Sequence, residues 1–382
     1  MKRIKTLIIG GGVSGMACGK KLNETGEEFL LVSKAMGGRM LTSQSHIVNY
    51  GASYITSEYK HTWPFMSGRE RIWIHQCQFF DEKELTTFYC KRTLRSLWPL
   101  IKLYFIARDF KHRLRALRKM ALYEEQQDVL ASDTVLSRYV KLPAKEFIIK
   151  NGLGDLNEVF FSPLFYSTGF IDYTESNTFH YLDCLMEVFC RIYVADHSHC
   201  CKDLMQGWED RVIMETVRLL KKTKDGRYLV RTNKSVYSAR NVVLAIPYKD
   251  AHRLYPVPKP ERNVPIYTFE IKGQRKKVYS HKPIVFFKPL VDDITILWRQ
   301  RNGNDIAYSK FSKPKLDDYY ASHKIVKRIY WPTGTVISGS KWVPQILDKG
   351  LYLASDYNIL GLEDAFITGV FAANQIIGGK KE

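Results

Sequence analysis

Six residues near the start of the chain have the spacing of a phosphate-binding glycine loop. They read Gly10-Gly11-Gly12-Val13-Ser14-Gly15, which is a G-x-G-x-x-G sequence. In such a loop the first glycine permits a tight turn, the second lets the backbone approach a pyrophosphate, and the third lets a helix pack closely on a strand. The chemistry that this pattern predicts is the binding of a dinucleotide by backbone N–H groups at a helix N-terminus.

The segments on either side of this loop are those that would position it. Residues 4–9 form an apolar run of strand length, and Met16, Gly19 and Lys20 follow the loop at helical spacing. A second apolar run at residues 29–32 completes a strand–loop–helix–strand unit. The glycine pattern gains its meaning from this context.

Further strands of the same domain are expected far downstream. Short strands are predicted at 217–222, 227–232, 235–239 and 241–246, and a last core strand at 350–356 precedes a helix over 365–377. Between these blocks, residues from about 60 to 200 are rich in aromatic side chains and predict helices, whereas residues from about 251 to 334 predict a sheet.

The expected fold class is therefore α/β, with a Rossmann-like domain built on a parallel sheet and interrupted by a mixed α+β substrate domain. The nucleotide-binding domain is expected at 1–60, 200–250 and 335–382, and the substrate domain at 61–199 and 251–334.

Four stretches resemble the flavin-containing amine oxidase superfamily. They are the glycine loop, Gly37-Gly38-Arg39-Met40, Asn49-Tyr50-Gly51-Ala52-Ser53-Tyr54, and the closing pair Leu351-Tyr352-Leu353-Ala354-Ser355-Asp356 with Leu362-Glu363-Asp364-Ala365. The stretch at 241–247 is similar to a further strand of that family. The resemblance implies FAD as the cofactor and places its binding residues at Gly10, Gly12, Val13, Ser14, Gly15, Ser33, Lys34, Gly38, Arg39, Met40, Gly51, Ala52, Ser53, Val217, Asp356, Glu363, Asp364 and Ala365.

The same resemblance implies a role for most of these residues. The glycine loop would hold the pyrophosphate, Arg39 would flank the phosphates or the flavin, and Gly51 with Ala52 would pass close to the flavin ring. Val217 would contact the adenine end, and Asp356 the ribityl or phosphate portion. The helix that begins near Glu363 would direct its positive end at the flavin.

Two positions depart from the family pattern. Dinucleotide folds usually place an acidic residue at the end of the second strand, where this chain has Ser33 and Lys34. That pair could accept a ribose 2′-phosphate, so NADP is a less favoured alternative or second nucleotide. Asp364 stands where the family usually has glycine, so either its side chain points away from the flavin or the redox chemistry is altered.

The resemblance implies an FAD-dependent oxidoreductase that takes a hydride from an amine, a reduced pyridine or a lipophilic or polyene substrate to flavin N5, with the aromatic-rich helices forming the substrate pocket. No catalytic residue can be assigned, but hydride transfer needs alignment more than a general base. Trp342 is expected either in the core or beside the flavin. The alternative is a non-catalytic protein on the same fold that binds FAD or NADP and interacts with partners.

The cysteines and the apolar segments limit the class of protein. Seven cysteines without regular spacing favour a reducing compartment, and the cluster of His197, His199, Cys200 and Cys201 does not have the spacing of a zinc site, so no metal is expected. The sequence shows neither a signal peptide nor a spanning helix. We expect a cytoplasmic protein that is either soluble or peripheral to a membrane.

The net charge is +19, from 58 Lys and Arg against 39 Asp and Glu. Residues 91–119 contain ten basic side chains and one acidic one, interleaved with apolar and aromatic residues. Three interpretations stay open for this segment: a solvated helix, a helix that binds an anionic membrane surface, or a contact with an acidic protein or, less favoured, with nucleic acid. A small-molecule substrate is expected, and the sequence does not indicate an oligomeric state.

Overall fold

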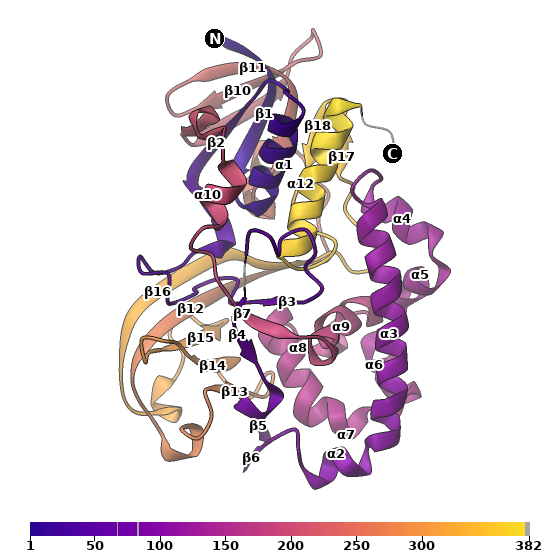
Figure 1. Cartoon of the computed structure of the whole chain (residues 1–382), viewed down its shortest axis with the longest axis vertical. Coiled ribbons are helices and arrows are strands. Elements are labelled where there is room, and N and C mark those ends of the chain that lie inside the picture. The colour runs from indigo at the N-terminus through magenta and orange to yellow at the C-terminus, as the bar shows by residue number, and fades with distance from the viewer. Residues whose placement is uncertain (67, 82–83, 379–382) are drawn as a thin grey trace.

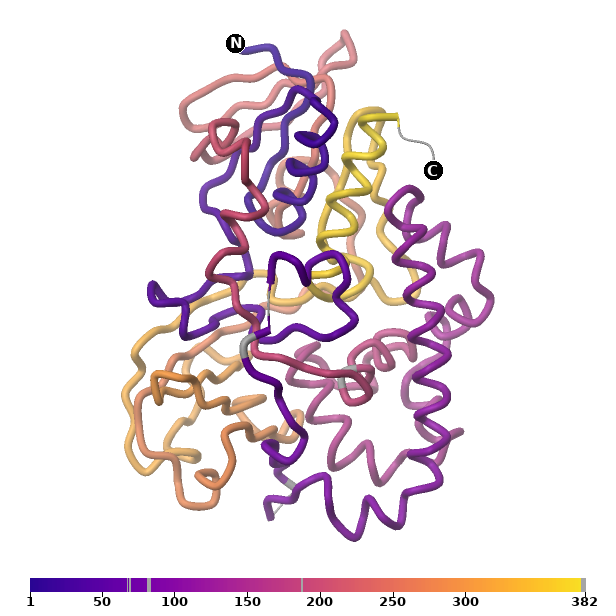
Figure 2. The backbone as a smooth tube through the Cα atoms, in the orientation of Figure 1, coloured from indigo at the N-terminus to yellow at the C-terminus, as the bar shows by residue number. Residues whose placement is uncertain are grey.

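The computed structural model describes residues 1–66, 68–81 and 84–378 (Figure 1). One end of the molecule holds the start of the chain, the hairpin strands β9 and β10 and the C-terminal helix α12, whereas the long helix α3 and a second sheet make up the other end (Figure 2). The chain passes between the two ends several times (Figure 2).

An eight-stranded sheet forms the core of the first end. Its path runs β17-β18-β11-β1-β2-β8, and the neighbours from β18 to β8 are parallel. Both faces of such a sheet are covered, which explains its nearly continuous apolar strands. The strands are β1 (Lys2–Gly11), β2 (Phe29–Met36), β8 (Val212–Met214), β9 (Val217–Lys222), β10 (Tyr228–Thr232), β11 (Val236–Leu244), β17 (Ile346–Asp348) and β18 (Leu351–Leu353).

The separate strands predicted at 235–239 and 241–246 are one strand, β11. Arg240 and Asn241 interrupt the apolar pattern but not the backbone pairing, because β11 stays in register with β1 from Tyr237 to Leu244. Its first half also pairs with β10 and its second half with β18. The last core strand is shorter than predicted, since β18 ends at Leu353.

Two helices cover one face of this sheet and contact each other closely. They are α1 (Val13–Glu24) and α12 (Leu362–Ile377). A side chain at Gly369 would overlap the carbonyl oxygen of Ser14, so glycine is needed where the helices meet. Beyond α10 (Cys200–Met205), the buried ring of Trp208 packs over Gly19, where a Cβ atom would lie 2.7 Å from it.

The other end combines two sheets with a group of helices. The seven-stranded sheet contains β5 (Cys77–Asp81), β6 (Glu84–Thr86), β12 (Arg262–Arg275), β13 (Ile284–Phe286), β14 (Ile296–Arg299), β15 (Asp305–Ser309) and β16 (Tyr320–Ile337). The three-stranded sheet contains β3 (Tyr54–Thr56), β4 (Gly68–Ile72) and β7 (Ile192–Ala195). The helices are α2 (Lys91–Arg95), α3 (Leu97–Met120), α4 (Gln126–Ser132), α5 (Thr134–Lys141), α6 (Ala144–Lys150), α7 (Gly154–Leu156), α8 (Ser162–Gly169) and α9 (Thr178–Leu185), with α11 (Tyr248–Leu254) beside the first sheet.

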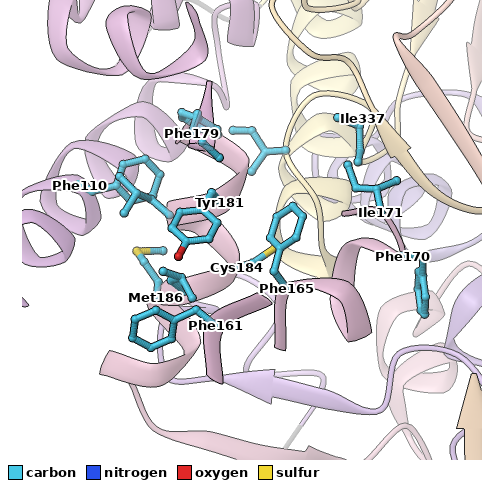
Figure 3. Close-up of a cluster of buried hydrophobic side chains, with 14 of the residues drawn as sticks. Phe110, Phe161, Phe165, Phe170, Ile171, Phe179, Tyr181, Cys184, Met186 and Ile337 are labelled. Carbon is cyan, nitrogen blue, oxygen red and sulfur yellow. The ribbon is translucent and has the colours of Figure 1, made fainter. Parts of the chain in front are cut away.

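The aromatic residues of the helical insertion pack against one another. Phe110 of α3 stacks edge-on against Phe179 of α9, with ring centroids 5.2 Å apart, and Phe165 of α8 contacts Tyr181 (Figure 3). Each of these four side chains is at most 1% exposed. The aromatic richness of this segment therefore builds a core. Within the described parts of the chain, none of the helices has both the length and the apolar character needed to cross a bilayer.

Candidate functional site

The glycine loop has the geometry that its sequence predicts. A Cβ atom on Gly10, whose φ is 119°, would overlap the carbonyl oxygen of Ala245, and one on Gly15 would overlap that of Gly10. Gly12 differs from both, because no atom of the described residues beyond its chain neighbours lies within 4 Å of where its Cβ would be. Gly10 and Gly15 are therefore required by packing within the protein, whereas Gly12 faces open space that a ligand can fill.

The first turn of α1 opens onto that space. Gly12 is the N-cap residue, and among the described residues no side chain caps the helix. The carbonyl oxygen of Gly12 accepts from Met16, but the N–H groups of the first turn precede the first intrahelical hydrogen bonds. These donors and the positive end of the helix dipole form a site suited to a phosphate group. The side chains of Val13 and Ser14 are buried, so this contact would be made by their backbone.

Two further segments predicted for the site meet the glycine loop. A Cβ atom on Gly38 would lie 3.1 Å from the Cα atom of Gly12. The carbonyl oxygen of Arg39 accepts a hydrogen bond of 2.8 Å from the N–H group of Ala52, and a side chain at Gly51 would overlap that same oxygen. The structure thus brings together the loops at 10–15, 37–40 and 51–52.

Arg39 links these loops to the end of β18. Its guanidinium forms an ion pair with Asp356 and donates to the carbonyl oxygen of Gly334 at 3.1 Å. The other carboxylate oxygen of Asp356 accepts from the N–H group of Gly361 at 3.4 Å, just before α12 begins. A continuous series of contacts therefore runs from the glycine loop to the N-terminus of α12.

Ser33 is used by the protein itself. Its Oγ accepts from the N–H group of Gly11 at 2.9 Å and donates to the carbonyl oxygen of Ala35 at 2.6 Å. Lys34 is exposed, and its Nζ lies 3.9 Å from Asp250. Val217 is buried at the start of β9, a few residues after Met214, which pairs with Ser33. The hydroxyl group of Ser33 therefore holds the glycine loop in place from the end of β2.

Glu363 at the start of α12 binds a loop of the protein. Its carboxylate accepts hydrogen bonds of 2.8 to 3.0 Å from the N–H groups of Lys60, His61 and Thr62, from the Thr62 hydroxyl and from Nδ1 of His61. Burial alone would raise the pKa of Glu363, but these hydrogen bonds and the charge of Arg118 hold it below its ordinary value. Glu363 is therefore ionised and fixes the 60–62 loop against α12.

Asp364 points toward α3. Arg118 binds its carboxylate through two nitrogen atoms, with Nη2 at 2.6 Å and Nε at 3.1 Å from Oδ2. The carboxylate is fully buried and Arg118 is 6% exposed. The Asp364 side chain is therefore held in an ion pair with a cation from α3.

A second carboxyl group, that of Asp183 on α9, interacts with the same ion pair. Its pKa is raised from 3.8 to about 7, mainly by desolvation and also by the charge of Asp364, while the charge of Arg118 opposes the rise. The pKa of Asp183 is higher in the folded state than in the unfolded state. Its contribution to the free energy of unfolding is therefore complete below the pKa of the unfolded state and is lost as the pH rises through about 7.

The Asp183→Asn variant should therefore gain stability relative to the wild type as the pH increases. We expect the difference in Tm, variant minus wild type, to grow between about pH 5 and about pH 8, as measured by thermal unfolding in a series of buffers. A difference that is constant across this range would show that Asp183 does not titrate there.

The remaining predicted residues lie in the supporting structure. Met40 and Ala365 are buried in the core between α1 and α12. The hydroxyl group of Ser53 lies 2.6 Å from that of Tyr308 on the second sheet. His197, which the sequence placed in a cluster without metal spacing, has its Nε2 2.7 Å from the carbonyl oxygen of Ala52. Since a carbonyl group only accepts, this nitrogen donates and holds the 51–52 loop.

Trp342 lies in the core, where its ring packs edge-on against Phe179 with centroids 5.3 Å apart. Its indole Nε1 is buried and has no hydrogen-bond partner among the described residues. Buried donors are nearly always hydrogen-bonded, so an acceptor atom of a bound ligand would explain this one.

The residues fit the phosphate half of a dinucleotide better than its ring half. At the glycine loop, backbone donors face open space at Gly12. Farther along the series of contacts, Arg39, Glu363 and Asp364 are all engaged by other protein groups. Two surface hollows lie elsewhere, one of about 240 Å³ among α3, α4 and α5 and one of about 230 Å³ between α1 and α12.

Comparison with known proteins agrees with this geometry. Residues 8–68 match the family model described as an NAD(P)-binding Rossmann-like domain, and that match contains the glycine loop, Arg39 and Gly51. Among curated proteins, sequence comparison finds no relative of the chain.

Solved structures share the fold over nearly the whole chain. A putrescine oxidase superposes with a TM-score of 0.66 and 12% identity, over 99% of both chains. A CLA-producing fatty acid isomerase from P. acnes gives a TM-score of 0.67 and 12% identity over 98% of both. Cyclohexylamine oxidase from Brevibacterium oxydans gives 0.62 and 10% identity, again over 98% of both. The chain therefore shares the α/β fold of these proteins, and the predicted fold class is confirmed.

The sequence did not reveal the partners of the acidic residues on α12. In the sequence, Arg118 is one of ten basic residues between 91 and 119. A signal was present, however, because Arg118 continues the buried stripe of α3 formed by Leu103, Ala107, Phe110, Leu114 and Leu117. A cation on an apolar stripe of a helix needs a buried counter-ion.

Proposed function

We propose that the chain is an oxidoreductase that uses a bound dinucleotide, FAD, to take a hydride from a small organic substrate. The observation that carries the proposal is the open space at Gly12, faced by the uncapped first turn of α1 and continuous with Gly38, Arg39 and Asp356. The fold shared with two amine oxidases supports the oxidoreductase class.

The surroundings of Ser33 favour FAD over NADP. A ribose 2′-phosphate would need free donors at the end of β2. The Ser33 hydroxyl is engaged with Gly11 and Ala35, whereas Lys34 is exposed with its Nζ 3.9 Å from Asp250. Ser33 is therefore not a free donor for a 2′-phosphate.

Bound FAD would supply a hydride acceptor. The chain would contribute the backbone donors of residues 12–15 for the phosphates, and the Arg39–Asp356 ion pair would hold the 38–39 and 51–52 loops in position. The Arg118–Asp364 ion pair would keep the negative charge of Asp364 away from that site. The substrate class proposed from the family resemblance is an amine, a reduced pyridine or a lipophile.

A non-catalytic nucleotide-binding protein is the second candidate. It is favoured by the aromatic side chains of the helical insertion, which pack as a core (Figure 3), and by the pairing of Glu363 and Asp364 within the protein.

Anaerobic mixing separates the two candidates. The FAD-loaded protein is mixed without oxygen with putrescine, cyclohexylamine, a polyunsaturated fatty acid and NADPH in turn, with dithionite as the positive control. We expect one class of substrate to bleach the flavin absorbance. If only dithionite bleaches it, the second candidate is preferred.

A further inference from the structure

The inserted helices present an apolar face to solvent. Large apolar side chains of α2 and of the first half of α3 are exposed on it, and we call this surface the α2–α3 face. Its members and their exposed fractions are Leu94 (73%), Leu97 (52%), Trp98 (76%), Ile101 (40%), Tyr104 (48%) and Phe105 (58%). It lies at the end of the molecule opposite the start of the chain and helix α12 (Figure 1).

This face is not part of the protein core. On α3 the exposed residues recur at helical spacing on the side opposite Leu103, Ala107 and Phe110, which are buried against the other helices. The helix has therefore already buried one apolar stripe and carries a second one outward. Soluble surfaces rarely gather large apolar side chains in this way unless they bind something.

The charges around this face are basic. Lys91, Arg95, Lys102 and Arg108 are exposed beside it. Four of the five basic residues farther along α3 are used differently, because Lys111 and Arg115 pair with Glu58, Arg113 with Asp109 and Asp133, and Arg118 with Asp364. The structure thus divides the basic segment into a half that stabilises the protein and a half that surrounds the apolar face.

We propose that the chain docks on the surface of an anionic lipid bilayer through the α2–α3 face. Leucine, isoleucine and phenylalanine side chains would enter the boundary of the acyl chains, Trp98 and Tyr104 would lie at the headgroup level, and the flanking cations would contact anionic headgroups. The helix lies on the membrane and does not cross it. This docking does not depend on the proposed redox function.

Other occupants fit the face less well. A nucleic acid would use the cations but would gain nothing from exposed leucine and isoleucine between them. A second copy of the chain in a two-fold arrangement would place the same cations opposite one another. Of these three occupants, the lipid surface is the one that uses the apolar stripe and the cations together.

The test is vesicle flotation of the full chain. Vesicles of phosphatidylcholine alone are compared with vesicles that also contain phosphatidylserine, at low and high salt. We expect the wild type to float with the anionic vesicles, less at high salt and less with neutral vesicles. The Trp98→Ser/Phe105→Ser variant should bind at least about tenfold more weakly, and Lys102→Gln/Arg108→Gln should lose the preference for anionic vesicles.

Two matched controls keep this test specific. The Leu290→Ser/Val291→Ser variant removes apolar side chains that are as exposed as Trp98 but lie outside the α2–α3 face. The Lys224→Gln/Lys234→Gln variant removes exposed cations at the end of the molecule that holds the eight-stranded sheet. Both controls should float like the wild type, and all variants should keep the wild-type Tm. The proposal is overturned if the wild type does not float, if the controls lose binding equally, or if the Trp98 variant instead abolishes a dimer or binding to duplex DNA.

Discussion

Replacing Arg118 with alanine should lower the free energy of unfolding by about 3–5 kcal/mol, the largest single-site effect that we expect on stability. Arg118 is 6% exposed and its partner Asp364 is fully buried, so the variant leaves a carboxylate without a counter-ion in the core. Glu363, the preceding residue, holds a second negative charge in the same turn of α12. The effect can be measured by denaturant unfolding at neutral pH.

A half-exposed ion pair on the same helix provides the control. Arg113 pairs with Asp109 and Asp133 near the surface, and its replacement by alanine should cost about 0–1 kcal/mol. The double variant Arg118→Met/Asp364→Leu should recover most of the loss, because it removes both charges together. If Arg118→Ala and Arg113→Ala have equal effects, Arg118 does not hold a buried charge.

Replacing Gly12 with valine should weaken FAD binding about 100-fold or more, which corresponds to about 2.8 kcal/mol, while the protein stays folded. Gly12 has φ −80° and ψ −179°, an extended conformation that valine adopts readily, and among the described residues beyond its chain neighbours no atom lies within 4 Å of its Cβ position. The added side chain would occupy only the space where the backbone approaches the pyrophosphate. Titration with FAD, followed by flavin fluorescence, measures the affinity.

Two other glycines show whether the effect is specific. Gly154 is exposed with open space at its Cβ position, so Gly154→Val should leave FAD affinity unchanged. Gly15→Ala should instead destabilise the fold, since its side chain would overlap the carbonyl oxygen of Gly10. A Gly12→Val protein that binds FAD as well as the wild type does would place the nucleotide elsewhere.

The sequence predicted those parts of the site in which contacts within one short segment require a particular residue type. Gly10 and Gly15 are recognised by spacing because the steric need for glycine arises within one strand–loop–helix unit. The parallel sheet was predicted from the same unit, because a helix joins the apolar runs at residues 4–9 and 29–32. The prediction of two separate strands at 235–239 and 241–246 was wrong, because the backbone pairing with β1 continues past the polar residues Arg240 and Asn241 of β11.

The rest of the site depends on contacts between distant segments. Arg118 and Asp364 are 246 positions apart, and Arg39 and Asp356 are 317 apart. No local pattern indicates which cation meets which carboxylate. The role of Ser33 was also hidden, because its residue type is compatible both with a ligand and with the backbone of Gly11 that it in fact binds.

The visible absorption spectrum of the purified chain, recorded before and after incubation with FAD and removal of free ligand, tests the central claim most directly. The proposed function predicts the yellow absorbance of a bound flavin at one per chain, present in the wild type and in Gly154→Val and absent in Gly12→Val. A wild-type protein that is colourless and takes up no FAD, while its thermal unfolding shows an intact fold, would contradict the account.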